Sequence, residues 1–204
     1  MQINKKSSAA PLALAQLPMY DWPEIATATD TLWGAIRDAF NQRDICAPTT
    51  LDRSLPRDQI WLSKQLLLSQ TCGLPLVQTL RKQVKVLGIF EYEGIAPAGA
   101  YHSVIIARAD NGKDLASLQG KRVAINGVDS YSGCLALKCA VAPFTPGDVF
   151  FSEVLVTGSH RESIRAVANG SADTAAIDCV NWQLAKHHGA AAKTLDIIAH
   201  PPSR

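Results

Sequence analysis

The sequence of 204 residues predicts an α/β fold in which mainly parallel sheets are flanked by helices. Strand and helix patterns alternate along nearly the whole chain, and polar residues gather where strands pass into helices. Glycine and proline concentrate at residues 93–100, where we expect a hinge between two lobes. Hydrophobic residues make up 47% of the chain and charged residues 19%, which indicates a globular protein with a sizeable core.

In the first half of the chain, short apolar runs alternate with helical stripes. A strand is expected at residues 12–19, and Pro23 suits the first turn of the helix that follows. Apolar positions of this helix recur at spacings of three and four residues: Ile25, Ala28, Leu32, Trp33, Ile36 and Phe40. Breakers and apolar runs then predict a loop at 47–56, a helix at 57–64, a strand at 66–68, a helix at 74–82 and a strand at 84–90.

The second half continues the same alternation after a Gly/Pro-rich bend at residues 94–99. Ser159 and Glu162 form an S-x-x-E capping box that opens a helix. The expected elements are strands at 103–108, 122–125, 154–156, 174–177 and 195–199, and helices at 114–119, 132–141, 160–168 and 180–188.

Composition excludes several classes of function. The 20 basic residues nearly balance the 18 acidic ones and form no long run, so nucleic acid is not an expected partner. Five cysteines without metal-ligand spacing predict neither a disulfide framework nor a zinc site. Dinucleotide and P-loop motifs are missing, and we expect no cofactor and no metal. No stretch reaches the roughly 18 apolar residues that a membrane helix needs.

The start of the chain shows some features of an export signal. Two lysines lie within residues 1–6, and residues 9–17 are largely apolar. Pro11 and Gln16 interrupt that run, and no clear cleavage site follows it. We interpret the run as the first strand and identify no export signal.

Ligands of open parallel sheets gather at the carboxyl ends of strands, where helix N-termini offer unpaired N–H groups. Ser130, Tyr131 and Ser132 open a helix after the strand at 122–125, and two of their hydroxyls could hold a phosphate, phosphonate or carboxylate. The alternative is a simple helix cap with nothing bound. Thr71, within the polar segment 69–73, has the same two interpretations.

Two further polar residues lie on the predicted crevice, His160 one position after a predicted helix cap and Asp178 at the end of a strand. His160 could add positive charge near an anion, or be an ordinary surface histidine. Asp178 could accept hydrogen bonds from an amine or hydroxyl, or cap the next helix. Cys179 lacks an identifiable base, so a catalytic residue is not expected.

Taken in order, these junctions resemble the PhnD-like phosphate- and phosphonate-binding group of the periplasmic solute-binding proteins, with their two-lobed type 2 fold. Segments that carry the resemblance are L-A-Q-L-P-M-Y at 14–20, L-S-Q-T-C-G at 68–73, Y-H-S at 101–103, N-G-V-D-S-Y-S-G at 126–133, V-T-G-S-H at 156–160 and A-I-D-C at 176–179. It covers nearly the whole chain.

The resemblance implies a substrate-binding component of an ABC-type transporter, which holds a small oxyanion solute in a cleft between lobes and delivers it to a permease. The expected contacts from lobe 2 are Ser130, Tyr131, Ser132 and His160. Tyr20 and Thr71 would approach from lobe 1, with Tyr101 at the crossover and Asp178 at the solute's amine or hydroxyl end. The implied location is periplasmic, and we expect a monomer.

The same resemblance divides the chain into lobe 1 at residues 1–98, lobe 2 at 99–190 and a crossover back toward lobe 1 at 191–204. Lobe 1 is then incomplete, because the usual C-terminal return of the fold is missing. The alternative is a cytoplasmic enzyme on the same scaffold, similar to the chorismate dehydratases or the thiamine-pyrimidine synthesis proteins, with Asp178 or His160 as acid or base. A ligand-sensing domain of a larger regulator is a third hypothesis.

Overall fold

The computed structural model describes residues 13–96, 100–145 and 149–201, which form two compact units. One unit contains the described residues up to Thr71 together with Gln78–Val84, and the other contains Cys72–Val77 and the described residues from Lys85 onward. The chain therefore changes unit earlier than the predicted hinge at 93–100, part of which lies outside the described residues. The predicted lobe boundaries stay predictions.

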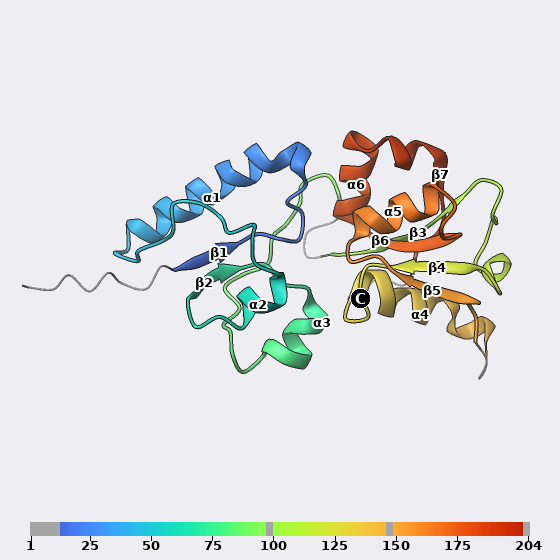
Figure 1. Cartoon of the computed structure of the whole chain (residues 1–204), viewed down its shortest axis with the longest axis horizontal. Helices are drawn as coiled ribbons and strands as arrows, with labels where there is room; N and C mark the ends of the chain where they lie inside the picture. The colour runs from blue at the N-terminus through green and yellow to red at the C-terminus, as the bar shows by residue number, and fades with distance from the viewer. Residues whose placement is uncertain (1–12, 97–99, 146–148, 202–204) are drawn as a thin grey trace, which may run out of the picture. The chain divides into compact units, whose positions relative to one another are not determined.

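The first unit is built on two parallel strands, β1 (Leu14–Gln16) and β2 (Leu66–Ser69). Helix α1 (Ala26–Asn41) runs alongside this pair after a 3-10 turn at Pro23–Ile25, and the short helix α2 (Arg57–Trp61) packs against both strands (Figure 1). One core cluster of this unit holds four buried side chains, Ala15, Leu17, Trp33 and Leu51, and Ile60 and Trp61 of α2 are also buried. These elements confirm the pattern predicted for this part of the chain; β1 and α2 are shorter than predicted, and β2 extends one residue further, to Ser69.

Only part of the predicted stripe of α1 faces this core. Trp33 is 2% exposed and its indole Nε1 donates to the Pro48 carbonyl at 3.2 Å, while Ile36 and Phe40 pack beside it. Leu32 is 42% exposed, and Ala28 is also on the outer surface. The three- and four-residue spacing was right for the helix but wrong for these two positions, because the two-stranded sheet covers a narrow stripe.

The predicted strand at residues 84–90 is wrong. The preceding helix is short and ends in a π turn, α3 (Gly73–Pro75) followed by η2 (Leu76–Leu80), and the chain after it is irregular. Leu87 and Ile89 are 64% and 89% exposed. Apolar β-branched residues favour a strand only where a neighbouring strand pairs with them, and none does so here among the described residues.

The second unit contains a mixed five-stranded sheet in the order β5-β4-β6-β3-β7. Its strands are β3 (Ser103–Arg108), β4 (Arg122–Ile125), β5 (Glu153–Val156), β6 (Thr174–Asp178) and β7 (Leu195–Ala199). Strand β4 pairs in parallel with β5 and β6, whereas β3 is antiparallel to β6 and β7. Four strands therefore share one direction, as the sequence predicted for a mainly parallel sheet.

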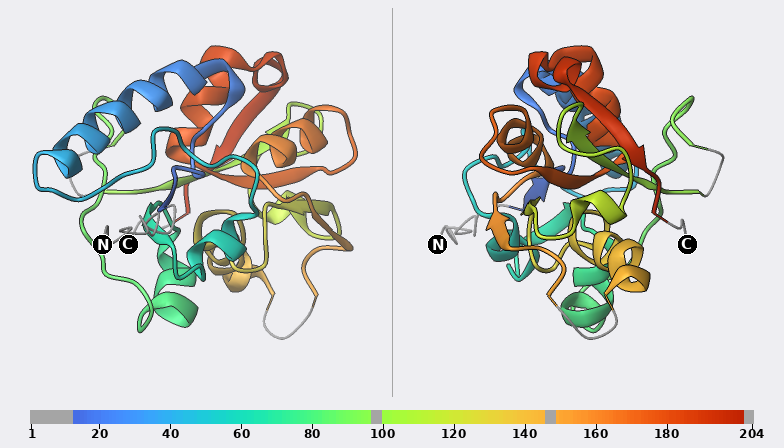
Figure 2. Two further views of the ribbon diagram at one scale, coloured as in Figure 1. Left: turned by 60° about the vertical axis from the view of Figure 1, so that its left-hand side comes forward. Right: turned by 90° about the vertical axis from the view of Figure 1, so that its right-hand side faces the viewer.

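Helices cover both faces of this sheet. Figures 1 and 2 show α4 (Ala136–Val141) on one face and α5 (His160–Ala168) and α6 (Cys179–His188) on the other. Shorter turns complete the layers: η3 (Ala116–Leu118), η4 (Tyr131–Leu135), η5 (Ala142–Phe144) and η6 (Ala190–Thr194). Alternate residues along the strands point to opposite faces, so Ile105 packs toward α4 in the larger core cluster.

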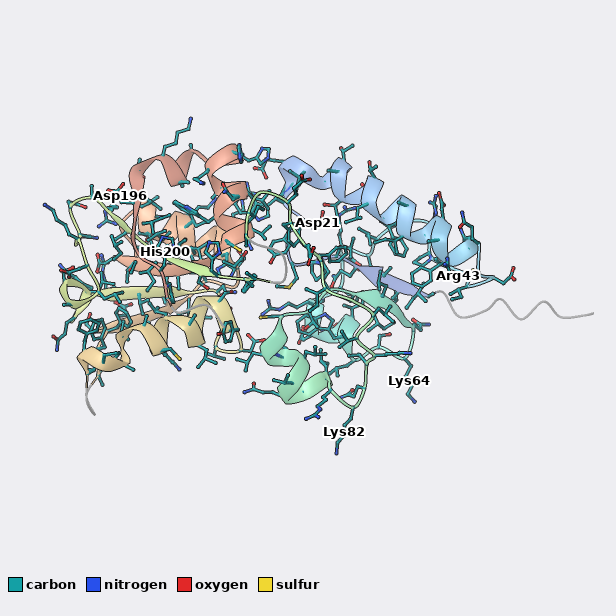
Figure 3. All side chains as sticks on the ribbon, turned by 180° about the vertical axis from the view of Figure 1, so that it is seen from behind. Asp21, Arg43, Lys64, Lys82, Asp196 and His200 are labelled. Atoms are coloured by element: carbon teal, nitrogen blue, oxygen red, sulfur yellow. The ribbon has the colours of Figure 1, made fainter. Side chains whose placement is uncertain are left out.

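Charged residues lie mainly at the surface. Figure 3 shows Lys64 and Lys82 with their side chains pointing away from the ribbon, and both are exposed. Arg53 is held by the carboxylates of Asp21 and Asp30 at 2.6 and 2.8 Å. Within the described residues, no helix is both long and apolar enough to cross a bilayer.

An ion pair ties down the amino end of β6. Asp173, 8% exposed, accepts from Arg122 Nε at 3.0 Å, from the Arg122 backbone N–H at 2.9 Å and from Asn111 Nδ2 at 3.1 Å. The Arg122 guanidinium is the main cause that lowers the pKa of Asp173 from 3.8 to about 2. This carboxylate is therefore ionised in the folded protein at pH values where the unfolded chain has begun to bind a proton.

Acid should remove the contribution of this pair. Because the pKa of Asp173 is depressed by folding, its stabilisation is complete above about pH 4 and is lost as the pH falls toward 2. We expect Asp173→Asn to melt roughly 2–5 °C below the wild-type protein at pH 6. Thermal unfolding between pH 6 and pH 2 should show this gap closing, and a gap that stays constant would contradict the assignment.

Candidate functional site

Three neighbouring parallel strands of the second unit deliver polar residues to the same end of the sheet. The turn that holds Ser132 follows β4, α5 with His160 at its start follows β5, and Asp178 ends β6. Tyr101 lies two residues before β3, and β3 runs antiparallel to β6 with Ser103 opposite Asp178. The amino end of β3 therefore lies at the carboxyl end of β6, and Tyr101 reaches the same place.

Side chains from these elements form one hydrogen-bonded chain, here called the polar cluster: Tyr101, Ser132, His160 and Asp178. Ser132 Oγ lies 3.0 Å from His160 Nε2, and the same nitrogen lies 3.2 Å from Asp178 Oδ2. The Tyr101 hydroxyl hydrogen-bonds with Ser132. Ser132, His160 and Asp178 are 2%, 6% and 1% exposed, so the cluster is part of the interior.

Burial is the main cause that raises the pKa of Tyr101 above its usual value, and the negative charge of Asp178 raises it further. A hydrogen bond with Ser132 acts in the opposite direction but is weaker. The phenol therefore keeps its proton throughout the physiological range. Tyr101 is consequently a neutral hydrogen-bonding group in the cluster.

Ser130 begins the helix that contains Ser132. Its Oγ accepts from the Gly133 backbone N–H at 3.0 Å, which confirms the cap interpretation of this residue. The backbone N–H groups of Tyr131 and Ser132 lie in the first turn of the helix. N–H groups at this position have no carbonyl of the same helix to bond. A cap and an anion site are compatible, because the Ser130 hydroxyl keeps its own hydrogen to donate.

Two residues that the sequence analysis did not single out support the cluster. Asn126 follows β4 directly, is 8% exposed, and its Oδ1 has no hydrogen-bond partner among the described residues. Gly133 lies against it: an added Cβ would overlap Asn126 Oδ1 and stand 3.0 Å from His160 Cε1. The position of Asn126 after a strand was a usable signal, whereas the close approach to Gly133 was not visible in the sequence.

Asp178 caps α6, as one of its two interpretations predicted. Its Oδ1 accepts from the backbone N–H groups of Val180 and Asn181 at 2.9 Å each. The neighbouring Cys179 is buried, which raises the pKa of its thiol and disfavours the reactive thiolate. His160 is buried at the first position of α5, after Ser159 caps that helix by accepting from the Glu162 N–H at 3.1 Å. The surface alternative for His160 is therefore wrong.

The remaining predicted contacts lie elsewhere. Tyr20 follows β1 and Thr71 follows β2, and these parallel strands end on the same side of the first unit. A hydrogen bond of 3.4 Å from the Met19 N–H to Gln70 Oε1 links the segment after β1 to the segment after β2. Tyr131 is half-buried at the start of η4. The structure thus brings Tyr101, Ser132, His160 and Asp178 into contact, and Tyr20 and Thr71 to one end of the first unit.

Solved structures with a similar fold include two from phosphonate transport. A binding protein component of an ABC phosphonate transporter from Pseudomonas aeruginosa is 16% identical, with 94% of this chain and 65% of that one covered and a TM-score of 0.67. PhnD1 from Prochlorococcus marinus, in complex with methylphosphonate, is also 16% identical, with coverage of 94% and 72% and a TM-score of 0.70. The chain therefore spans just under two thirds of the Pseudomonas protein.

A more distant likeness is holo ArgBP from T. maritima, 14% identical, with coverage of 94% and 79% and a TM-score of 0.53. These neighbours are type 2 periplasmic binding proteins, which confirms the predicted fold. No curated protein matches the chain in sequence. The alternative of an enzyme on this scaffold receives no support from the comparisons.

A family model described as "ABC transporter, phosphonate, periplasmic substrate-binding protein" matches residues 63–203, which include β2 and every element of the second unit's sheet. The match contains all four residues of the polar cluster. It confirms the resemblance on which the sequence-based predictions rested. The chain belongs to the family of periplasmic substrate-binding proteins of ABC phosphonate transporters.

Proposed function

We propose that this protein binds a small phosphonate- or phosphate-like solute in the periplasm, as the substrate-binding component of an ABC-type transporter, and presents it to a membrane permease. One observation carries the proposal: in a member of this family, a hydrogen-bonded cluster of half-buried Tyr101 with buried Ser132 and His160 stands at the start of a helix. Helix N-termini and hydroxyl groups favour oxyanions.

The groups proposed to hold the anion are donors of three kinds. Ser130 and Ser132 supply hydroxyls, and the N–H groups that open η4 supply the positive end of the helix dipole. His160 can add positive charge when protonated. Tyr20, Thr71 and Tyr131 stay predicted contacts, and so does action of the protein as a monomer.

Removing both hydroxyls should abolish most of the affinity. A hydrogen bond to a charged group contributes about 1.5–3 kcal/mol, so Ser130→Ala with Ser132→Ala should weaken binding by at least about 100-fold. Calorimetric titration of the full chain with methylphosphonate and with inorganic phosphate measures this loss. Thermal shift gives a second readout, because a ligand at 100 times its dissociation constant adds ~2.7 kcal/mol to stability.

A matched control is available in the same unit. Ser152 and Ser171 are exposed and precede β5 and β6, so they lie at the opposite, amino end of the parallel strands. Ser152→Ala with Ser171→Ala should leave both affinities unchanged. A cooperatively folded wild-type protein that binds neither anion would overturn the proposal.

A further inference from the structure

The carboxylate of Asp178 is fully committed to groups of the protein. Oδ1 accepts from the Val180 and Asn181 N–H groups at 2.9 Å, and Oδ2 accepts from the Asn181 side-chain amide and lies 3.2 Å from His160 Nε2. At 1% exposure the side chain has no room to turn toward a solute. This geometry gives Asp178 a different role from the amine recognition that the family resemblance implied.

A carboxylate can only accept hydrogen bonds, so the His160 nitrogen that faces it must carry a hydrogen. That nitrogen, Nε2, is also 3.0 Å from Ser132 Oγ. Because Nε2 is a donor, Ser132 Oγ is an acceptor in this contact. The single hydroxyl hydrogen of Ser132 is then not used by His160. The Tyr101 hydroxyl can accept it in the ligand-free protein, but a charged oxyanion is a stronger acceptor than a neutral phenol.

We propose that Asp178 is a positioning residue for anion binding: it keeps the hydrogen of His160 on Nε2, and so directs the hydroxyl hydrogen of Ser132 toward the bound oxyanion. The inference rests on the proposed function. It deepens that function by separating the groups that contact the solute from a carboxylate that acts through His160. The negative charge of Asp178 is thereby tolerated in an anion site, because its oxygens point to protein donors.

Asp178→Asn tests the inference without removing the helix cap, since Asn and Asp cap helices about equally well. Two backbone N–H groups require an oxygen at the Oδ1 position, so the amide nitrogen of the variant must take the place of Oδ2. It then donates to His160 Nε2 and moves the ring hydrogen to Nδ1. Asn181 can rotate its own amide to offer an oxygen.

With Nε2 turned into an acceptor, the Ser132 hydroxyl donates to His160 rather than to the anion. We expect methylphosphonate to bind the variant about 10-fold or more weakly. Asp173→Asn is the matched control. Asp173 is also a buried carboxylate, but it precedes the amino end of β6, where it pairs with Arg122, whereas Asp178 lies at the carboxyl end. This control variant should leave the affinity unchanged.

Imidazole ¹⁵N NMR of the ligand-free protein reports directly which ring nitrogen of His160 carries the hydrogen. The His160 signal is identified by its loss in His160→Gln. The wild-type ring should carry its hydrogen on Nε2, and the ring in Asp178→Asn should carry it on Nδ1. A hydrogen on Nδ1 in the wild-type protein, with anion binding intact, would overturn this inference alone.

A double-mutant cycle supplies the second test. If Asp178 acts through Ser132, Asp178→Asn should cost no further affinity in a Ser132→Ala background. If the fold losses in affinity of the two single variants simply multiply in the double variant, the positioning role is overturned. Absence of any methylphosphonate or phosphate binding by the wild-type protein would overturn the proposed function, and the positioning role with it, whatever the NMR shows.

Discussion

Gly133→Ala is expected to abolish anion binding and to destabilise the second unit. The added Cβ would overlap Asn126 Oδ1 and stand 3.0 Å from His160 Cε1, and all three residues are buried. The buried Asn126 amide must therefore rotate away, and the His160 ring must shift by a few tenths of an ångström. Overpacking of this kind costs about 1–3 kcal/mol, which lowers the melting temperature by roughly 3–10 °C.

Thermal unfolding and methylphosphonate titration measure the two effects together. Gly34→Ala is a suitable control, because an added Cβ at that α1 position meets nothing within 4 Å. Shortening the neighbour should restore part of the stability: Asn126→Ala in the Gly133→Ala background removes the main overlap. A Gly133→Ala protein that binds as tightly as wild type would show that the site does not depend on this close approach.

Trp33→Ala should unfold the first unit while the second stays folded. Trp33 is the largest of the four buried side chains in one core cluster of the first unit, and its indole also donates to the Pro48 carbonyl at 3.2 Å. Truncation of a buried aromatic residue costs about 3–5 kcal/mol, which is a large share of the stability of a small unit. The second unit has its own cluster around Ile105 and Leu137, which the substitution does not touch.

Hydrogen exchange detected by mass spectrometry distinguishes the units. Amides of β1, β2 and α1 should lose protection in Trp33→Ala, whereas those of β3 to β7 should keep it. Leu32→Ala, at the adjacent and 42% exposed position of α1, should leave both patterns unchanged. Simultaneous loss of protection in both units would contradict separate cores.

Much of the second unit could be predicted from the sequence because its signals are local. The strand at 195–199 was predicted at its observed bounds, and Ser159 was recognised as a helix cap. Ser130 and Asp178 were each placed at the start of a helix, with capping as one interpretation. Caps and strands depend on side chains a few residues apart, so the order of residues contains the information.

The first unit and the segment that follows it at residues 85–90 were harder to predict, since their patterns depend on what covers them. The β-branched residues at 84–90 indicated a strand, yet they pair with no strand among the described residues. Leu32 fits the apolar period of α1 but faces outward. Hydrophobic periodicity reports which residues could be buried, and the width of the neighbouring sheet decides which of them are.

The sequence by itself determined the α/β class, the family and the polar residues that end its strands. Only the tertiary structure decided that Ser132 and Asp178 both contact the Nε2 atom of His160, and that the missing side chain of Gly133 leaves room for Asn126. The Ser132–His160 contact joins residues 28 positions apart, the His160–Asp178 contact residues 18 apart, and the Gly133–Asn126 contact residues 7 apart. They exist because β5, β4 and β6 lie side by side in parallel, so that the strand order, which no local pattern encodes, brings their carboxyl ends together.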